Sequence, residues 1–119
     1  MDFHKLFKSF GFAFYGIWTS LKEQNMRIHI FCAVVVLIAG FLTGLTVTEW
    51  LILTLTIALV IGAEMINTAI ESVVNLASPD IHPLAKQAKD VAAGAVLVFA
   101  LASVIIGLLI FLPKWFNFN

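Results

Sequence analysis

The stretch WLILTLTIALVIGAEMINTAIESVVNL, residues 50–76, decides the fold of this chain. Its first fourteen residues carry no charge, and charged side chains appear only from Glu64 onward. A helix of about 20 apolar residues is long enough to cross the hydrocarbon core of a bilayer. We therefore predict a membrane-spanning helix over residues 50–76, with a polar stripe in its second half that needs its own explanation.

The rest of the chain is also strongly apolar. Of its 119 residues, 61% are hydrophobic and 12% are charged, and the mean hydropathy is +1.03. Soluble domains are about half apolar and about a quarter charged. Residues 28–45 and 91–112 form two further apolar windows of sufficient length. The sequence therefore predicts an all-α membrane protein with three transmembrane helices, at residues 28–45, 50–76 and 91–112.

The basic residues predict the orientation of these helices. Six of them precede the first span or lie between the second and third, and one follows the third: Lys5, Lys8, Lys22, Arg27, Lys86 and Lys89 against Lys114. Cytoplasmic loops of membrane proteins carry the excess of Lys and Arg. We therefore expect a multi-pass protein of the cell membrane, with its N-terminus and second loop in the cytoplasm and its C-terminus outside.

Residues 1–26 have the pattern of an amphipathic helix. Large apolar side chains recur at helical spacing: Phe3, Leu6, Phe7, Phe10, Phe14, Ile17, Trp18 and Leu21. At about 100° per residue they fall within an arc of about 120°. Lysines and other polar residues occupy the opposite side. Since basic, aromatic-rich helices of this kind usually lie in the membrane interface, we predict an interfacial helix over residues 1–26.

Five polar residues share one face of the span at 50–76: Glu64, Asn67, Thr68, Glu71 and Asn75. At helical periodicity the other four lie within about 60° of Glu64. With a rise of about 1.5 Å per residue, Glu64 lies about 20 Å along the span and Glu71 about 30 Å. This depth places Glu64 in the inner leaflet and Glu71 at the cytoplasmic interface.

An ionisable side chain inside a membrane costs about 2.5–3.5 kcal/mol on insertion scales and usually has a functional role or a partner. Hydrogen bonds between helices are a purely structural alternative, and this alternative suits Asn67 and Thr68. It suits Glu64 and Glu71 poorly, because an amide would join helices at a lower desolvation cost. We therefore interpret the two glutamates as functional residues.

Charged residues of the two cytoplasmic segments extend the polar stripe. Glu23, Lys86, Lys89 and Asp90 all flank predicted spans on the cytoplasmic side. Carboxylates and lysines suit Mg²⁺ with a phosphate ligand, because Mg²⁺ takes one or two carboxylates and completes its shell with water and phosphate oxygens. The chain has neither of the two common glycine-rich nucleotide motifs. The histidines show no metal-ligand spacing, and we assign a loop or interface role to His4, His29 and His82.

Two stretches of the chain resemble a known family. EMINTAIESVVN, residues 64–75, resembles the signature E-x-x-N-[ST]-[SA]-[LIV]-E-x-x-V-D of the small prokaryotic integral-membrane diacylglycerol kinases and undecaprenol kinases. HPLAKQAKDVAAGAVL, residues 82–97, resembles the segment that follows this signature. The forms EQNMRIHI and KDVAAGAVL are more similar to the Gram-positive branch, whose members are undecaprenol kinases. The similarity extends over nearly the whole chain.

This resemblance implies ATP- and Mg²⁺-dependent phosphorylation of a membrane lipid alcohol by a homotrimer with composite sites. Undecaprenol is the favoured substrate, and diacylglycerol is the alternative. The family pattern makes Glu64 the catalytic base and Asn67 a catalytic-site amide, while Glu23 and Glu71 would hold Mg²⁺. Together with these two glutamates, the residues implied in nucleotide binding are Lys5, Phe12, Asp80, Ile81, His82, Lys89 and Asp90.

Two positions depart from the family pattern. Asn75 replaces the final Asp of the signature, which removes a carboxylate, and Ala93 replaces a Ser of the enteric enzymes, which fits a different lipid preference. A small oligomeric ion or proton conductor is an alternative from another class, because a glutamate stripe can line a pathway. A conductor gives Lys89 and Asp90 no role, and a structural membrane adaptor leaves Glu64 unexplained. We expect no nucleic-acid partner.

Overall fold

The computed structural model describes residues 1–116, and residues 117–119, at the end of the predicted single domain, lie outside the described part. The chain forms four helices in the order α1 (Phe3–Ser20), α2 (Gln24–Thr43), α3 (Val47–Ala77) and α4 (Pro83–Phe116). Helices α2, α3 and α4 are long and apolar enough to cross a membrane. The prediction of an all-α protein with three candidate spans is therefore confirmed.

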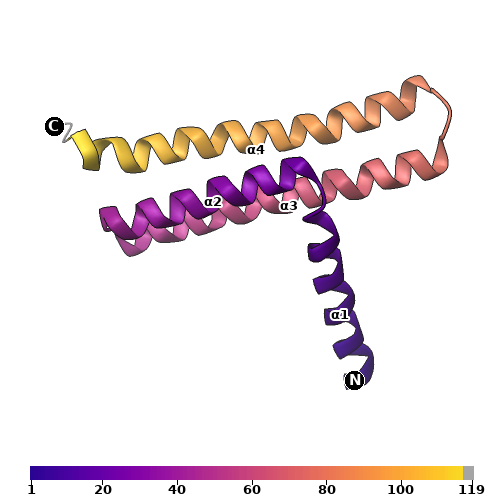
Figure 1. Ribbon diagram of the computed structural model, residues 1–119, viewed down its shortest axis with the longest axis horizontal. Coiled ribbons are helices and arrows are strands. Elements are labelled where there is room, and N and C mark those ends of the chain that lie inside the picture. The colour runs from indigo at the N-terminus through magenta and orange to yellow at the C-terminus, as the bar shows by residue number, and fades with distance from the viewer. Residues whose placement is uncertain (117–119) are drawn as a thin grey trace.

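Helices α2, α3 and α4 lie side by side, and α1 projects away from them (Figure 1). Each successive helix of the three reverses direction, and most of the helix packing is between α3 and α4. The α2–α3 turn and the C-terminal end of α4 therefore lie at one end, and the α3–α4 connection lies at the other. Helix α1 meets the start of α2 and runs across the bundle direction, with the N-terminus far from the other helices.

The helices extend beyond the apolar windows of the sequence. Helix α2 begins at Gln24, four residues before the predicted span, and α4 begins at Pro83, eight residues before it. Hydropathy marks the part of a helix that lies in hydrocarbon, whereas Lys and Gln continue a helix into the interface without difficulty. The first helix is shorter than the interfacial helix predicted over residues 1–26, because α1 ends at Ser20. Glu23 consequently precedes α2 as its N-cap and does not end the first helix.

Local sequence explains where the helices begin and end. The Asp2 side chain accepts hydrogen bonds from backbone N–H groups in the first turn of α1. Thr46 and Glu49 form a reciprocal capping box at the start of α3. Gly44 ends α2 with a φ of 81°, a conformation that glycine adopts without strain. Pro83 opens α4, where a missing backbone N–H costs little.

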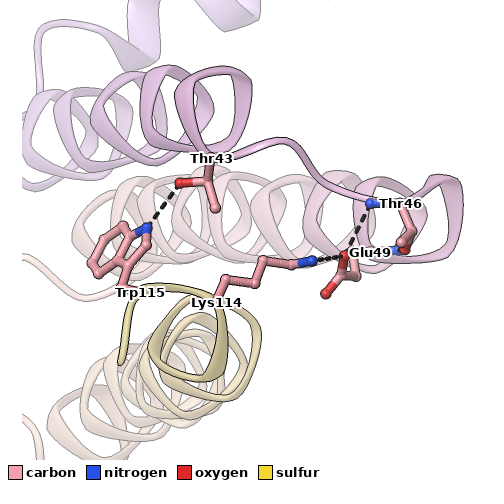
Figure 2. A network of polar contacts seen from close by, with 5 residues as sticks. All are labelled: Thr43, Thr46, Glu49, Lys114 and Trp115. Carbon is pink, nitrogen blue, oxygen red and sulfur yellow. Dashed lines mark hydrogen bonds and ion pairs between the residues drawn. The ribbon is translucent and has the colours of Figure 1, made fainter. Parts of the chain in front are cut away.

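A polar network holds the C-terminal end of α4 against the α2–α3 turn (Figure 2). Glu49 Oε1 accepts a hydrogen bond from the Thr46 backbone N–H at 2.9 Å and pairs with Lys114 Nζ at 2.9 Å. Trp115 Nε1 donates to Thr43 Oγ1 at 2.9 Å. These contacts join all three long helices at the end of the bundle opposite the α3–α4 connection.

Much of the apolar surface is exposed in the single chain. The buried apolar side chains are few among the described residues: Met26, Leu53, Val60, Ala92, Val96, Ile110 and Phe111. Large side chains remain exposed on every helix, including Phe7 at 72% and Phe41 at 77%. A contiguous apolar surface of this extent marks contact with lipid or with another protein. The exposure therefore agrees with a membrane protein.

Candidate active site

The polar stripe predicted on α3 forms a buried cluster. Glu64 and Asn67 are 3% and 5% exposed, Glu71 is half-buried, and Asn75 is exposed near the end of the helix. Asn67 Nδ2 donates a hydrogen bond to Glu71 Oε1 at 3.1 Å. Because buried polar groups cost free energy unless they are paired, a row of them on the covered face of α3 requires partners from other elements or from ligands.

Glu64 has such a partner on α2. Its Oε2 lies 3.5 Å from His29 Nε2, and the two side chains are 4% and 19% exposed. From its sequence context we expected only a loop or interface role for His29, and this contact between helices was missed. The pair fixes the side of α2 that faces the stripe and places an imidazole beside the most buried carboxylate of α3.

Glu23 reaches the same cluster from the start of α2. It occupies the N-cap position, but its side chain forms no capping hydrogen bond. Its charge and that of Glu71 both act on the Glu64 carboxyl. Glu23 and Glu71 are therefore both near enough to Glu64 for their charges to act on it, although Glu23 and Glu71 lie 48 positions apart in the sequence.

Most of the residues predicted to bind the nucleotide lie around the α3–α4 connection. Three exposed residues form the connection itself: Asp80, Ile81 and His82. On the first turns of α4, Lys89 is half-buried, and Asp90 Oδ2 pairs with Lys86 Nζ at 2.6 Å. This pair is exposed to solvent, with side chains 62% and 78% accessible, so both groups are available to a phosphate or a metal-bound ligand.

Lys5 and Phe12 lie apart from this cluster in the single chain. Both are on α1, whose side chains are exposed up to Ser20, and this helix leads away from the other three (Figure 1). Only the C-terminal end of α1, where Ser20 is buried, packs near α3. A contact between Lys5 or Phe12 and a nucleotide at the cluster would therefore need a movement of α1 or a neighbouring subunit.

The carboxylates at the edge of the cluster fit a magnesium ion better than a zinc ion. Within residues 1–116, no group of three or more His, Cys, Asp and Glu side chains is placed to hold a metal ion. Mg²⁺ requires only one or two protein carboxylates when phosphate oxygens and water supply the other ligands. Glu71 and Glu23 are carboxylates of the kind such a site would use, and the Glu23 side chain forms no capping hydrogen bond.

Comparison with known proteins assigns this chain to a family. A model of the prokaryotic diacylglycerol kinase family matches residues 11–111. The chain belongs to this family. The kinase is 53% identical over 114 residues to the undecaprenol kinase of Bacillus subtilis (strain 168), a match that covers 95% of this chain and 93% of that protein.

Two relatives named diacylglycerol kinase are less similar to this kinase. That of Synechocystis sp. is 44% identical over 110 residues, which are 91% of this chain but 63% of the longer relative. That of Helicobacter pylori (strain J99) is 34% identical over 98 residues, 81% of this chain and 76% of the relative. The family and its relatives establish a membrane lipid kinase that uses ATP as phosphate donor. The predicted enzyme class is thereby confirmed, and the ion-conductor and adaptor alternatives are excluded.

Proposed function

We propose that the kinase phosphorylates undecaprenol to undecaprenyl phosphate, with Glu64 as the general base. The observation that carries this proposal is the burial of Glu64. This residue is 3% exposed and lies on an apolar helix long enough to cross a membrane. Such a group has a high desolvation cost and therefore a functional role. The choice of undecaprenol is supported by the 53% identity to an undecaprenol kinase over nearly the full length of both chains.

Glu64 is suited to take the proton of a lipid hydroxyl group. The hydroxyl of a membrane lipid lies at the interface, and Glu64 lies about three helical turns before the end of α3. As the proton moves to Glu64, the alcohol oxygen forms a bond to the γ-phosphorus of ATP. The bond from that phosphorus to the β–γ bridging oxygen breaks, and ADP leaves. General-base catalysis of this kind contributes about 10²–10⁴-fold to the rate.

Asn67 is suited to contact the same hydroxyl. Its Nδ2 is committed to Glu71, while its Oδ1 is buried and has no hydrogen-bond partner among the described residues. An unsatisfied buried oxygen costs about 1–3 kcal/mol, so a hydroxyl that donates to it would be bound favourably. We assign this contact to the lipid alcohol, because Asn67 lies one turn from Glu64 on the same face.

The nucleotide would lie at the cytoplasmic side of the cluster. Glu23 and Glu71 offer the carboxylate oxygens that would hold Mg²⁺, whose charge neutralises the phosphates when it is bound. Lys89 and Asp90, with residues 80–82, would bind ATP from the α3–α4 connection. Phosphoryl transfer depends mainly on positioning and charge neutralisation, so this small set of side chains is sufficient.

We further propose that the active unit is a homotrimer in which α1 lies in the membrane interface. The apolar faces of α2–α4 that remain exposed in one chain support contacts between subunits. The direction of α1, away from its own bundle (Figure 1), supports a contact with a neighbour. Lys5 and Phe12 would then reach the nucleotide bound to an adjacent subunit, which makes each site composite.

Cysteine labelling tests the proposed orientation. In a background with Cys32→Ala, a Thr48→Cys variant should react with a membrane-impermeant thiol reagent in intact cells, and Asp80→Cys should react only after the membrane is opened. Both positions are exposed, one in the first turn of α3 and one in the α3–α4 connection. The excess of basic residues near Asp80 is the physical reason. Labelling in the opposite pattern would show that the nucleotide residues face away from cytoplasmic ATP.

A lipid comparison tests the proposed substrate. The purified kinase should transfer the ³²P-labelled γ-phosphate of ATP to undecaprenol with a kcat/KM at least about 10-fold above that for diacylglycerol, a difference of about 1.4 kcal/mol. Both lipids are presented in the same detergent at equal mole fraction, and Glu64→Gln protein provides the background. A preference for diacylglycerol would make the alternative substrate correct while leaving the lipid kinase assignment intact.

A further inference from the structure

We propose that His29 is a positioning residue for the catalytic base: its Nε2 holds Glu64 Oε2 so that the other carboxylate oxygen faces the lipid hydroxyl. This inference rests on the proposed role of Glu64 as the base. Nothing in the family signature around residues 64–75 assigns a role to His29, which lies on α2, outside that stretch.

The two side chains lie within the distance of an ion pair. His29 Nε2 and Glu64 Oε2 are 3.5 Å apart across the α2–α3 interface. An imidazole can donate from Nε2 either as the neutral tautomer or as the protonated ring. Catalytic hydrogen bonds are often long without substrate and shorten when the substrate is bound. Because Glu64 is 4% and His29 19% exposed at the side chain, water competes little for either group.

The charges around Glu64 indicate what His29 contributes to the site. Two carboxylates, Glu23 and Glu71, act on Glu64, and both repel its ionised form. Within residues 1–116, His29 is the group on a second helix that attracts the ionised carboxylate of Glu64. Asn67 lies one turn from Glu64, but it belongs to α3 itself and moves with that helix. His29 therefore supplies the contact that ties the base to a different helix.

His29 lines a cavity of about 330 Å³ between α2, α3 and α4, and the two hydroxyl groups that also line it are not free to replace the imidazole. The other described residues around the cavity are mostly apolar. Each hydroxyl group donates within its own helix: Thr56 to Ile52 O at 2.7 Å and Ser103 to Ala100 O at 2.6 Å. Without the imidazole, the Glu64 carboxylate would lose its contact with α2, and its side chain could rotate.

Three substitutions of His29 test the inference. A glutamine places its Nε2 about as far from the backbone as the histidine Nε2, whereas an asparagine reaches only about as far as Nδ1. We expect His29→Ala and His29→Asn to lower kcat about 10–100-fold, because a displacement of about 1 Å in a catalytic group can cost about 10² in rate. His29→Gln should recover most of the activity. The KM for ATP should change less than about twofold in all three.

Two controls separate the possible outcomes. Ser103→Ala, at the same cavity but without contact to Glu64, should keep wild-type kcat. If His29→Ala also keeps wild-type kcat while Glu64→Gln is inactive, the role of His29 is wrong and the base assignment stands. If Glu64→Gln is active, the proposed base itself is wrong.

The comparison between His29→Gln and His29→Asn distinguishes a loss of positioning from a folding defect. Assembly is checked by size-exclusion chromatography and ATP binding for each variant. If His29→Ala fails to assemble, the inference is decided by the two amides, which differ by one methylene group. Equal losses in His29→Gln and His29→Asn would overturn it, because a donor at the Nε2 position would then be irrelevant.

Discussion

Replacement of Glu64 by glutamine is expected to lower the rate of lipid phosphorylation by about 10²–10⁴-fold, the range that general-base catalysis supplies. Glutamine has nearly the same shape but cannot accept the hydroxyl proton. Nucleotide binding should persist, because Glu64 lies two helical turns deeper than Glu71 along α3. Single-turnover transfer of the labelled γ-phosphate measures the chemical step, and binding of a fluorescent ATP analogue measures the nucleotide site.

A second carboxylate on the same helix provides the matched control. Glu49→Gln changes α3 at the opposite end, where Glu49 pairs with Lys114 at 2.9 Å, and should leave the rate of transfer near wild type. Neutralising the buried Glu64 should not impair insertion into the membrane, since an ionised group there is costly. Near-normal activity of Glu64→Gln would remove the base assignment. Failure of this variant to assemble would favour the purely structural role of the stripe.

Replacement of Glu71 by glutamine is expected to raise the Mg²⁺ concentration needed for half-maximal activity by at least about 10-fold, with a corresponding loss of activity at fixed Mg²⁺. Removing a group that only hydrogen-bonds to a metal ligand already costs about 10–100-fold in metal affinity or activity. Glutamine can still accept the hydrogen bond that Asn67 donates at 3.1 Å, so the local structure of α3 should be retained. Titration of activity with Mg²⁺ at saturating lipid measures the effect.

Glu23→Gln should change the Mg²⁺ requirement in the same direction. Its side chain takes no part in capping α2, so a loss of activity cannot be attributed to a broken cap. Binding of Mn²⁺ with ADP, measured by electron paramagnetic resonance, detects the site without turnover. If Glu23→Gln has normal activity and an unchanged Mg²⁺ titration, Glu23 is not a metal ligand, and Glu71 would need a different partner.

The amino-acid sequence by itself determined the membrane fold and the polar face of α3. A helix in hydrocarbon satisfies its backbone hydrogen bonds internally, so the length and composition of residues 50–76 were enough to predict a span. The common direction of Glu64, Asn67 and Glu71 follows from helical periodicity alone. These are local properties, and the structure shows Glu64 and Asn67 buried on one face of α3.

Local patterns placed the helix ends less accurately. Apolar windows end where charged residues begin, but α4 continues through Lys86 and Lys89 to Pro83. The change of direction between α1 and α2 was also not visible, because the residues around Glu23 continue a helix-compatible pattern. The roles of the nucleotide residues remain predictions, since α1, which carries Lys5 and Phe12, leads away from the other helices within one chain.

Only the tertiary structure decided which side chain faces Glu64. The α2–α3 turn is centred near Leu45, and His29 and Glu64 lie 16 and 19 residues from it, so their depths differ by about 5 Å at a rise of about 1.5 Å per residue. That similarity of depth could be read from the sequence. The rotation of α2 about its own axis could not, because it depends on packing against α3 and α4. The same packing brings Lys114 to Glu49 at the opposite end of the bundle, since contacts between helices depend on side chains that are distant in sequence.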